Sequence, residues 1–210
     1  MEFLTTWLTV LTVGFLVVIT PGPNLAITMK NSLVYTKKAG IYTALGLAAG
    51  NLVHITYCLV GIGVLITQSI LLFNTIKWIG AVYLIYIGIK ALTARKQVQN
   101  SENKGQVYEM TRFYAFREGF LTDLLNPKAT MFFLALFTQI IQPHTPIFAQ
   151  VVYGLTVIST ELVWFTILAV FVSHRIIKQR YLSASHIFER LTGFVLVALG
   201  VKLALTRGNS

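Results

Sequence analysis

The chain has 210 residues, of which 55% are hydrophobic and only 11% are charged, and its mean hydropathy is +0.71. This composition is too apolar for a soluble domain and is typical of an integral membrane protein. The formal net charge is +10, but the basic residues lie in short segments between apolar runs. They therefore favour membrane lipids with anionic headgroups as partners and argue against nucleic acid. The single cysteine, Cys58, excludes an internal disulfide and a thiolate metal cluster.

Hydropathy divides the chain into six apolar runs with the length expected of membrane-spanning helices. In chain order they cover about Phe3–Met29, Ile41–Ile66, Ile70–Leu92, Phe120–Ile141, Phe148–Val172 and Leu191–Leu205, the last being long enough if it starts near Ile187. The first run lacks a basic segment and an evident cleavage site, so we expect it to be retained. The sequence thus predicts an all-α integral membrane protein with six transmembrane helices in a single domain, residues 1–210.

Lysine and arginine are distributed unevenly among the segments between these runs. They follow the first, third and fifth runs, at Lys30, Lys37, Lys38, Arg95, Lys96, Lys104, Arg112, Arg117, Arg175, Lys178, Arg180 and Arg190. The opposite segments and the C-terminus carry only Lys77 and Arg207. The positive-inside rule then places the segments after the odd-numbered runs in the cytoplasm and both termini outside.

Two apolar runs are interrupted by proline. The first break is Thr20-Pro21-Gly22-Pro23-Asn24, and the second is Asp123-Leu124-Leu125-Asn126-Pro127-Lys128. Proline has no amide N–H, so a helix continued through the first break would leave the carbonyls of Val17 and Ile19 without their usual donors, and Pro127 would do the same to Asp123. A bilayer tolerates such backbone only where protein or water satisfies it, so we expect both breaks to face a cavity.

The third and sixth runs resemble each other over Ile79–Leu92 and Thr192–Leu205. If each half of the chain holds three helices, these copies run in opposite directions. We therefore predict two inverted repeats, residues 1–92 and 118–210, joined by a cytoplasmic loop over residues 93–117. In transporters built this way, substrate binds near the midplane between broken helices. A chance similarity of two glycine-rich apolar runs is the alternative.

Charged and amide side chains at membrane depth are candidates for a site, because each is costly there unless it is paired or wet. Asp123 and Asn126 are spaced to share one helical face, where they either form a site or cap the fourth helix. Lys128 either pairs with Asp123 or reaches a polar cavity. Glu161 is the deepest carboxylate, and it is either half of a buried ion pair or a proton carrier.

Other polar and aromatic residues have plainer interpretations. Gly46, Gly50 and His54 recur at helical spacing, which favours a close helix contact with His54 hydrogen-bonded across it over a gating role. Trp164 can close a pocket, but packing is the commoner role of an aromatic residue in such runs. No metal site or cofactor is predicted from the sequence.

Several segments together resemble the LysE/RhtB superfamily of amino-acid exporters. They are Thr20–Asn24, Lys38–Gly50, Lys77–Gly88 and Phe120–Ala129, and they match in order over nearly the whole chain. The segment Glu161–Thr166 is most similar to the exporters of threonine, homoserine and homoserine lactone. The resemblance implies a secondary carrier in a bacterial inner membrane that is driven by proton entry. Carried over by position, the family motifs point to Pro21, Gly22, Pro23, Asn24, Asp123, Asn126, Pro127 and Lys128.

The resulting hypothesis is export of a small neutral amino acid by proton antiport with alternating access. The substrate ammonium would lie near freed carbonyls and Asp123, its carboxylate near helix N-terminal amides or Lys128, and a proton on Asp123 or Glu161 would favour outward release. Export of a metal cation or another small metabolite, a passive channel and an intramembrane enzyme are the alternatives. A homodimer is possible.

Overall fold

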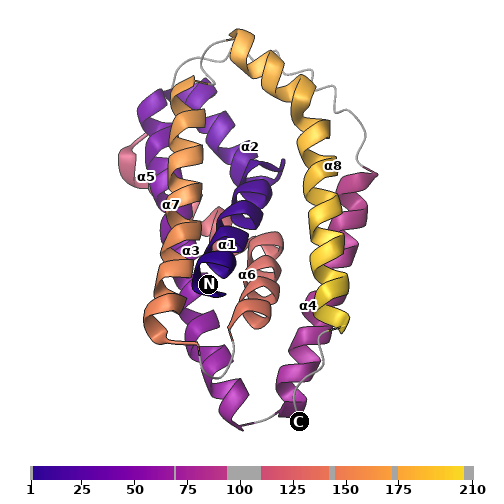
Figure 1. Cartoon of the computed structure of the whole chain (residues 1–210). Coiled ribbons are helices and arrows are strands. Elements are labelled where there is room, and N and C mark those ends of the chain that lie inside the picture. Colours follow the sequence, from indigo (N-terminus) through magenta and orange to yellow (C-terminus); the bar gives the residue numbers. More distant parts are fainter. Residues whose placement is uncertain (1, 69, 94–109, 142–144, 172–174, 206–210) are drawn as a thin grey trace.

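The protein is described here by a computed structural model, which covers residues 2–68, 70–93, 110–141, 145–171 and 175–205. Within these ranges every regular element is a helix, which confirms the all-α class (Figure 1). The elements are α1 (Glu2–Ile19), α2 (Pro23–Lys30), the π-helix η1 (Asn31–Tyr35), α3 (Lys37–Gln68), α4 (Ile70–Leu92), α5 (Arg112–Leu124), α6 (Pro127–Ile140), α7 (Ile147–Phe171) and α8 (Arg175–Leu205).

Some helices extend beyond the apolar runs that predicted them. The third run coincides with α4, but α5 begins at Arg112, so the segment predicted as a loop through Arg117 ends earlier. Thr111 caps this helix by accepting a hydrogen bond from the backbone N–H of Tyr114 at 3.3 Å. Likewise α8 begins at Arg175, well before the predicted sixth run. Hydropathy marks only the part of a helix that is apolar, whereas backbone hydrogen bonding continues through polar residues.

Four helical units among the described residues can be assessed as membrane spans by length and composition. Two single helices qualify, over Lys37–Gly61 in α3 and Ile147–Phe171 in α7. Two bent pairs qualify if each is one span: Phe3–Ile19 with Pro23–Tyr35, and Arg112–Leu124 with Pro127–Ile140. Each pair bends by 56° at its proline-containing break. The described chain thus has two such spans, or up to four when each bent pair is counted.

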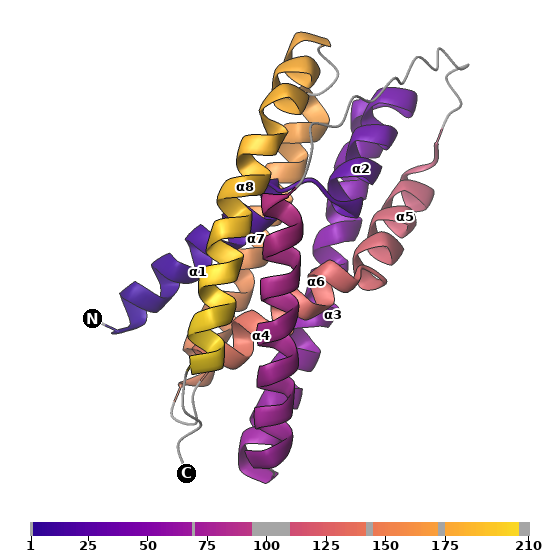
Figure 2. The same ribbon diagram turned by 90° about the vertical axis from the view of Figure 1, so that its right-hand side faces the viewer.

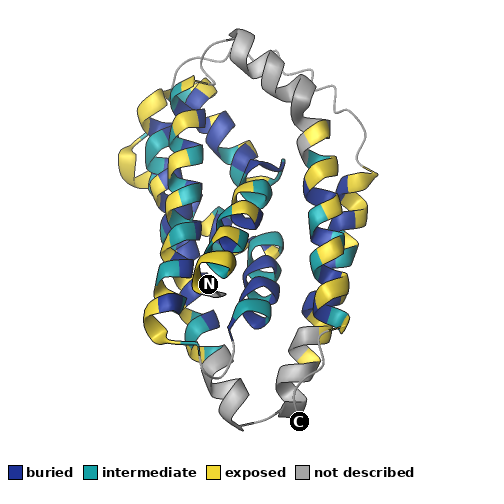
Figure 3. Cartoon of the chain, in the orientation of Figure 1, coloured by how far each residue is buried: buried dark blue, intermediate teal, exposed yellow. Residues whose placement is uncertain are grey.

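Apolar side chains cover much of the outer surface, and several charged and amide side chains lie inside. Val82, Phe113 and Phe194 are 63%, 74% and 69% exposed, whereas Asp123 and Glu161 are 0% and 3% exposed. Figure 3 shows exposed residues along the outer faces of α3, α4, α7 and α8. A chain with an apolar exterior and buried carboxyl groups suits lipid better than water, in agreement with the predicted membrane class.

Each broken helix packs in parallel against the long helix of the other half of the chain. Along α3 and α5, the guanidinium of Arg112 lies over the ring of Tyr42 at 5.7 Å, and further along both helices a Cβ added to Gly50 would lie 2.7 Å from Asp123 Oδ2. Along α1 and α7, the ring of Phe3 stacks on Tyr153 at 5.7 Å. Further along the same pair, Trp7 donates a hydrogen bond to Thr156 at 2.9 Å and Phe15 contacts Trp164. Within each pair, the two helices therefore run in the same direction.

The remaining long helices, α4 and α8, pack against each other in antiparallel orientation (Figure 2). Glycine allows their close approach: a Cβ added to Gly88 would lie 2.7 Å from the carbonyl oxygen of Gly193. Toward the other end of the pair, a Cβ added to Gly200 would lie 2.8 Å from the carbonyl oxygen of Ala81. The pair is joined to the rest of the bundle through α1 and α6, where Gln139 donates to the carbonyl of Leu199 at 3.0 Å.

Candidate functional site

A pocket lies where the two helix breaks meet. Its volume is about 50 Å³, which is enough for a few water molecules. Its lining combines charged, amide and apolar side chains from α1 to α3 and α5 to α7: Val17, Val18, Thr20, Gly22, Pro23, Asn24, Asn51, Asp123, Asn126, Lys128, Ala129, Phe132, Phe133, Val157, Glu161 and Phe165. The two predicted breaks, which are far apart in the sequence, therefore share one cavity.

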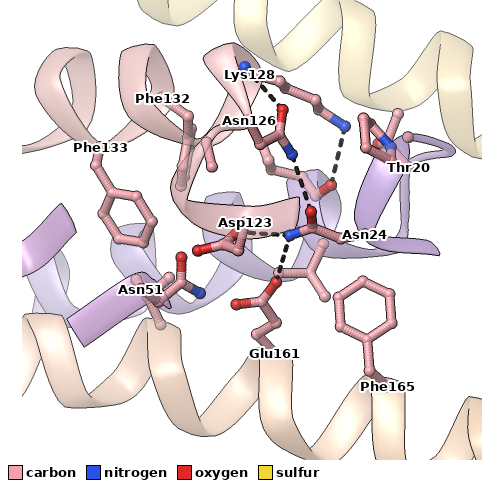
Figure 4. Close-up of a pocket in the computed structure, with 16 residues that line it drawn as sticks. Thr20, Asn24, Asn51, Asp123, Asn126, Lys128, Phe132, Phe133, Glu161 and Phe165 are labelled. Atoms are coloured by element: carbon pink, nitrogen blue, oxygen red, sulfur yellow. Dashed lines mark hydrogen bonds between the residues drawn. The ribbon is translucent and has the colours of Figure 1, made fainter. Parts of the chain in front are cut away.

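The side-chain amide of Asn24 connects both breaks to α7 (Figure 4). Its Nδ2 donates to Asp123 Oδ1 at 2.7 Å and to Glu161 Oε1 at 3.0 Å. Its Oδ1 accepts a hydrogen bond from Asn126 Nδ2 at 3.0 Å. One short side chain thus bonds to one oxygen of each of two buried carboxyl groups and to one amide. Hydrogen bonds of this kind to ionisable groups are among the stronger ones in proteins.

The local sequence explains why helices start at this pocket. α2 begins with Pro23 in its first turn after Gly22, whose backbone is extended, and no side chain caps that turn. α6 begins with Pro127, and Asn126 caps it by accepting from the backbone N–H of Lys128 at 3.0 Å. Proline fits the first helical turn because its missing N–H would have no partner there. Two helix N-termini, which carry partial positive charge, therefore lie beside the pocket.

The expectation that Asp123 and Asn126 share one helical face is wrong. α5 ends at Leu124 and Asn126 has an extended backbone, with φ −80° and ψ 107°, so the two residues belong to different helices. They meet instead through Asn24, which both contact. Asn126 also has the capping role, but for α6, the helix that follows it. The spacing rule failed because it assumes a continuous helix, which Pro127 prevents.

The carbonyls that the prolines leave without helical donors find other partners. The Val17 carbonyl accepts from the backbone N–H of Thr20 at 3.3 Å and from Lys128 Nζ at 3.4 Å. The Asp123 carbonyl accepts from the backbone N–H of Asn126 at 2.9 Å and hydrogen-bonds to His54 Nε2 at 3.0 Å. Lys128 thus reaches from the second break to the first, and His54 connects α3 to the second break.

Two buried carboxylate oxygens in the pocket have no hydrogen-bond partner among the described residues. They are Asp123 Oδ2 and Glu161 Oε2. The nearest basic group to the former is the ring of His54, whose Nε2 lies 3.5 Å away. A buried carboxyl oxygen without a partner is costly, which indicates a place for a proton, a water molecule or a cationic group.

The structure adds Asn51 to the pocket, a residue that was not predicted as part of the site. It lies on α3, it is 3% exposed, and it lines the cavity. The signal that could have found it is a carboxamide one residue after Gly50 in a long apolar run, where a polar side chain needs a partner.

The other predicted residues lie around this pocket or at its edge. Pro21, Gly22 and Pro23 form the first break. Gly46, Gly50 and His54 lie along the face of α3 that contacts α5, and a Cβ at Gly50 would lie 2.7 Å from Asp123 Oδ2. Trp164 does not line the cavity; its ring packs edge-on against Phe15 at 6.0 Å.

These features define an α-helical membrane protein with a small, charged pocket between two broken helices. The chain matches the LysE type translocator family over residues 15–207. It therefore belongs to this family and is a membrane exporter, as its resemblance to the LysE/RhtB superfamily predicted.

The curated relatives cover nearly the whole chain. The uncharacterized membrane protein YrhP of Bacillus subtilis is 31% identical over 92% of this chain and 96% of its own length. An uncharacterized membrane protein of Vibrio cholerae is 30% identical over 96% and 97%. The uncharacterized membrane protein YahN of Escherichia coli is 27% identical over 92% and 87%. No solved structure matches the chain.

Proposed function

We propose that this exporter moves small neutral amino acids, such as threonine or homoserine, or homoserine lactone, out of the cytoplasm in exchange for protons. The observation that carries the proposal is the pocket between the two breaks, which holds carboxyl groups, an ammonium group and an uncapped helix N-terminus. An amino-acid zwitterion needs partners of both signs close together. A volume of about 50 Å³ favours a small substrate, with modest movement of the lining needed to admit it.

The charges in the pocket suggest an orientation for the substrate. Its ammonium faces Asp123 and Glu161, which Asn24 holds side by side through their other oxygens. Its carboxylate faces the first turn of α2 and the ammonium of Lys128, whose Nζ would lie 3.6 Å from a Cβ placed on Gly22. Helix N-termini and lysine are both good partners for a carboxylate. The wall of Phe132, Val157 and Phe165 remains for the side chain.

We further propose that residues 1–92 and 118–210 are inverted repeats of three membrane-spanning helices each. Three findings support this. The chain bends by 56° at each of the two breaks. In addition, α1 packs in parallel on α7 and α5 packs in parallel on α3, while α4 and α8 contact each other in antiparallel orientation. α4 and α8 have 23 and 31 residues, and about 20 are enough to cross a bilayer. The charge distribution supports an inner-membrane location with both termini outside.

Alternating access around the pocket then couples export to proton entry. A proton from outside that binds Asp123 or Glu161 removes the negative charge that holds the substrate ammonium, so the substrate leaves outward. The deprotonated pocket, once it faces the cytoplasm, binds the next substrate. The packing of α1 and α6 against α4 and α8, on one side of the pocket, supplies contacts that can break and re-form in such a cycle.

The proposal is tested by efflux from right-side-out membrane vesicles. The vesicles are preloaded with a mixture of labelled amino acids, and efflux is followed with and without an imposed pH gradient. We expect selective, gradient-dependent efflux of threonine or homoserine in the wild type and its loss in Asp123→Asn. Glu118→Gln is the matched control, because this carboxyl lies outside the pocket beside Lys30, at 3.5 Å, and should leave efflux unchanged.

Three results would contradict parts of the proposal. Gradient-driven efflux that persists in both Asp123→Asn and Glu161→Gln would rule out the coupling scheme. No efflux of any amino acid would rule out the substrate class and direct the assay to metal cations and other small metabolites. Large unitary currents in electrical recordings would indicate a channel in place of a carrier.

A further inference from the structure

One polar side chain of the pocket, that of Asn51, has no role in the contacts described above. Asn51 is 3% exposed, yet its carboxamide makes no hydrogen bond to any side chain or backbone group among the described residues. A carboxamide that lines a cavity and bonds to no neighbouring residue is free to bind a group that enters the cavity, so its presence calls for an explanation. The pocket beside it is the place where a partner can bind.

Asn51 lies next to the two carboxylate oxygens that also have no partner. Asp123 Oδ2 lies against the α3 backbone at Gly50, where an added Cβ would be 2.7 Å away, and Asn51 is the next residue of that helix. Glu161 lies beside Asp123, because the Asn24 amide nitrogen bonds to one oxygen of each, at 3.0 and 2.7 Å. Figure 4 shows Asn51, Asp123 and Glu161 directed toward the same region of the pocket from three different elements.

The chemistry of these three groups selects one kind of ligand. Asp123 Oδ2 and Glu161 Oε2 are buried acceptors without a hydrogen-bond partner among the described residues, and Asn51, which lines the same pocket, adds a carboxamide oxygen as a third acceptor. Two neighbouring carboxylates repel each other, and a cation between them relieves the repulsion. A primary ammonium carries one positive charge and three N–H donors, which match three acceptors. A secondary ammonium has two donors and a quaternary ammonium has none.

We infer that Asn51, Asp123 and Glu161 form a three-acceptor subsite for a primary ammonium group, in which Asn51 supplies the neutral acceptor. The inference rests on the proposed function for its substrate, since it assigns the ammonium end of the amino acid to these residues. It goes further in two respects. It makes Asn51 a specificity-determining residue, and it restricts the substrates to primary amines, so that N-methylated and cyclic secondary amino acids are rejected.

The test uses probes that carry no carboxylate, so that it is independent of amino-acid export. Ethylammonium and dimethylammonium are isomers with the same charge and three or two N–H donors, and tetramethylammonium has none. Binding to the purified full-length protein is followed by calorimetry and by the ligand-induced shift of thermal unfolding. We expect ethylammonium to bind at least tenfold more tightly than dimethylammonium, and tetramethylammonium not to bind.

Two variants separate the role of Asn51 from a general effect on folding. Asn51→Leu keeps the approximate size but removes the carboxamide, and we expect it to weaken ethylammonium binding by about tenfold. Asn51→Gln keeps the carboxamide on a longer stem and should bind more tightly than Asn51→Leu. Thr56→Val is the matched control on α3, because its exposed hydroxyl, within the described part of the chain, bonds only to the carbonyl of Leu52. It should bind as the wild type does.

The possible results distinguish this inference from the proposed function. Equal binding of the three probes, wild-type binding by Asn51→Leu, or no binding of ethylammonium by a folded wild-type protein would each overturn the subsite. If ethylammonium binds selectively through Asn51 but no amino acid is exported, the subsite stands and the proposed substrate class fails. If amino acids are exported and Asn51→Leu exports them with unchanged affinity, the function stands and the subsite fails.

Discussion

Asn24 is the residue on which the geometry of the pocket depends. Its amide nitrogen bonds to Asp123 and Glu161, and its amide oxygen accepts from Asn126. The partners come from α5, from α7 and from the residue that caps α6. A side chain of any other chemistry would leave at least one of these groups without its partner, because only a carboxamide offers both donors and an acceptor at this length.

We therefore expect Asn24→Leu to be strongly destabilising. It leaves two buried carboxyl groups without a donor and the Asn126 amide without an acceptor, which should lower the free energy of unfolding by about 3 kcal/mol or more. Thermal unfolding of the purified protein measures the change. Gln150→Leu removes a side-chain amide whose one bond among the described residues is to the carbonyl of Thr145, and we expect it to lower the free energy of unfolding by about 1 kcal/mol at most. Equal losses in the two variants would contradict the central role of Asn24.

His54 has a positioning role that its neutral ring can perform. Its Nε2 bonds to the Asp123 carbonyl at 3.0 Å, while its Nδ1 lies 2.8 Å from the hydroxyl of Tyr57 and its ring stacks on Phe133. His54→Phe keeps the stacking but removes the bond to the break, so we expect a loss of about 1–3 kcal/mol in unfolding free energy.

The same variant should slow amino-acid efflux without abolishing its dependence on the pH gradient, because His54 does not line the pocket. Tyr57→Phe is the matched control, since it leaves the Nε2 bond in place, and its effect should be smaller on both measurements. Loss of the gradient dependence in His54→Phe would assign His54 a part in proton transfer and contradict this role.

The sequence identified most of the charged and amide residues of the pocket but not how they meet. Asn24, Asp123 and Lys128 follow from the proline breaks, because a membrane span with missing backbone donors must meet a polar cavity. Asn51 was missed because the pattern of Gly46, Gly50 and His54 points to the neighbouring face of α3, about 100° away from Asn51 around the helix. Which of those faces meets the pocket depends on the packing of α3 against α5, and this is a tertiary property.

At the scale of helices, the close contact of α3 with α5 depends on glycine at Gly46 and Gly119. A methyl group at Gly46 would collide with the backbone carbonyl of Phe116, and backbone cannot move aside as a flexible side chain can. We expect Gly46→Ala to lower the free energy of unfolding by about 2–3 kcal/mol and to reduce efflux, because it displaces α5 and with it Asp123.

Gly61→Ala is the matched control for this prediction. It lies on the same helix, and an added Cβ there would meet nothing within 4 Å. Alanine favours the helix over glycine, so stability should be unchanged or rise by up to about 1 kcal/mol. Thermal unfolding of both variants decides the question. An equal response would mean that the α3–α5 contact tolerates a methyl group and is looser than the structure indicates.

The helices themselves were predictable where they are apolar and less so where they are polar or irregular. Hydropathy located α3, α4 and α7, and proline located both breaks. The polar beginnings of α5 and α8 carry no such signal. The π-helix η1, with the backbone N–H of Thr36 bonded to the carbonyl of Asn31 at 3.2 Å, has none either. It is stabilised by the side chain of Asn31, which donates to Thr43 and Glu118 at 2.9 and 3.0 Å.

At the scale of the whole molecule, the fold relates the two ends of the bundle to the two sides of the membrane. α1 is parallel to α7, and α3 is parallel to α5, so the N-terminal ends of α1 and α7 lie together at one end of the bundle. The beginnings of α3 and α5 lie together in the same way, near the pair of Lys30 with Glu118. If the proposed topology holds, these two ends lie on opposite sides of the membrane.

Accessibility of single cysteines tests this topology. Cys58 is the only cysteine and is buried, so a Cys58→Ser chain serves as the background once its efflux is shown to be intact. Thr36→Cys and Thr111→Cys lie just before α3 and α5, and Thr5→Cys and Ile147→Cys lie near the beginnings of α1 and α7. We expect an impermeant maleimide to label Thr5→Cys and Ile147→Cys on intact cells, and Thr36→Cys and Thr111→Cys only in inverted vesicles. If all four variants are labelled from the sides opposite to those expected, the orientation of the chain is corrected and the repeats are kept. Labelling of Thr36→Cys and Thr111→Cys from opposite sides would contradict the inverted arrangement, because it would mean that α3 and α5 run in opposite directions.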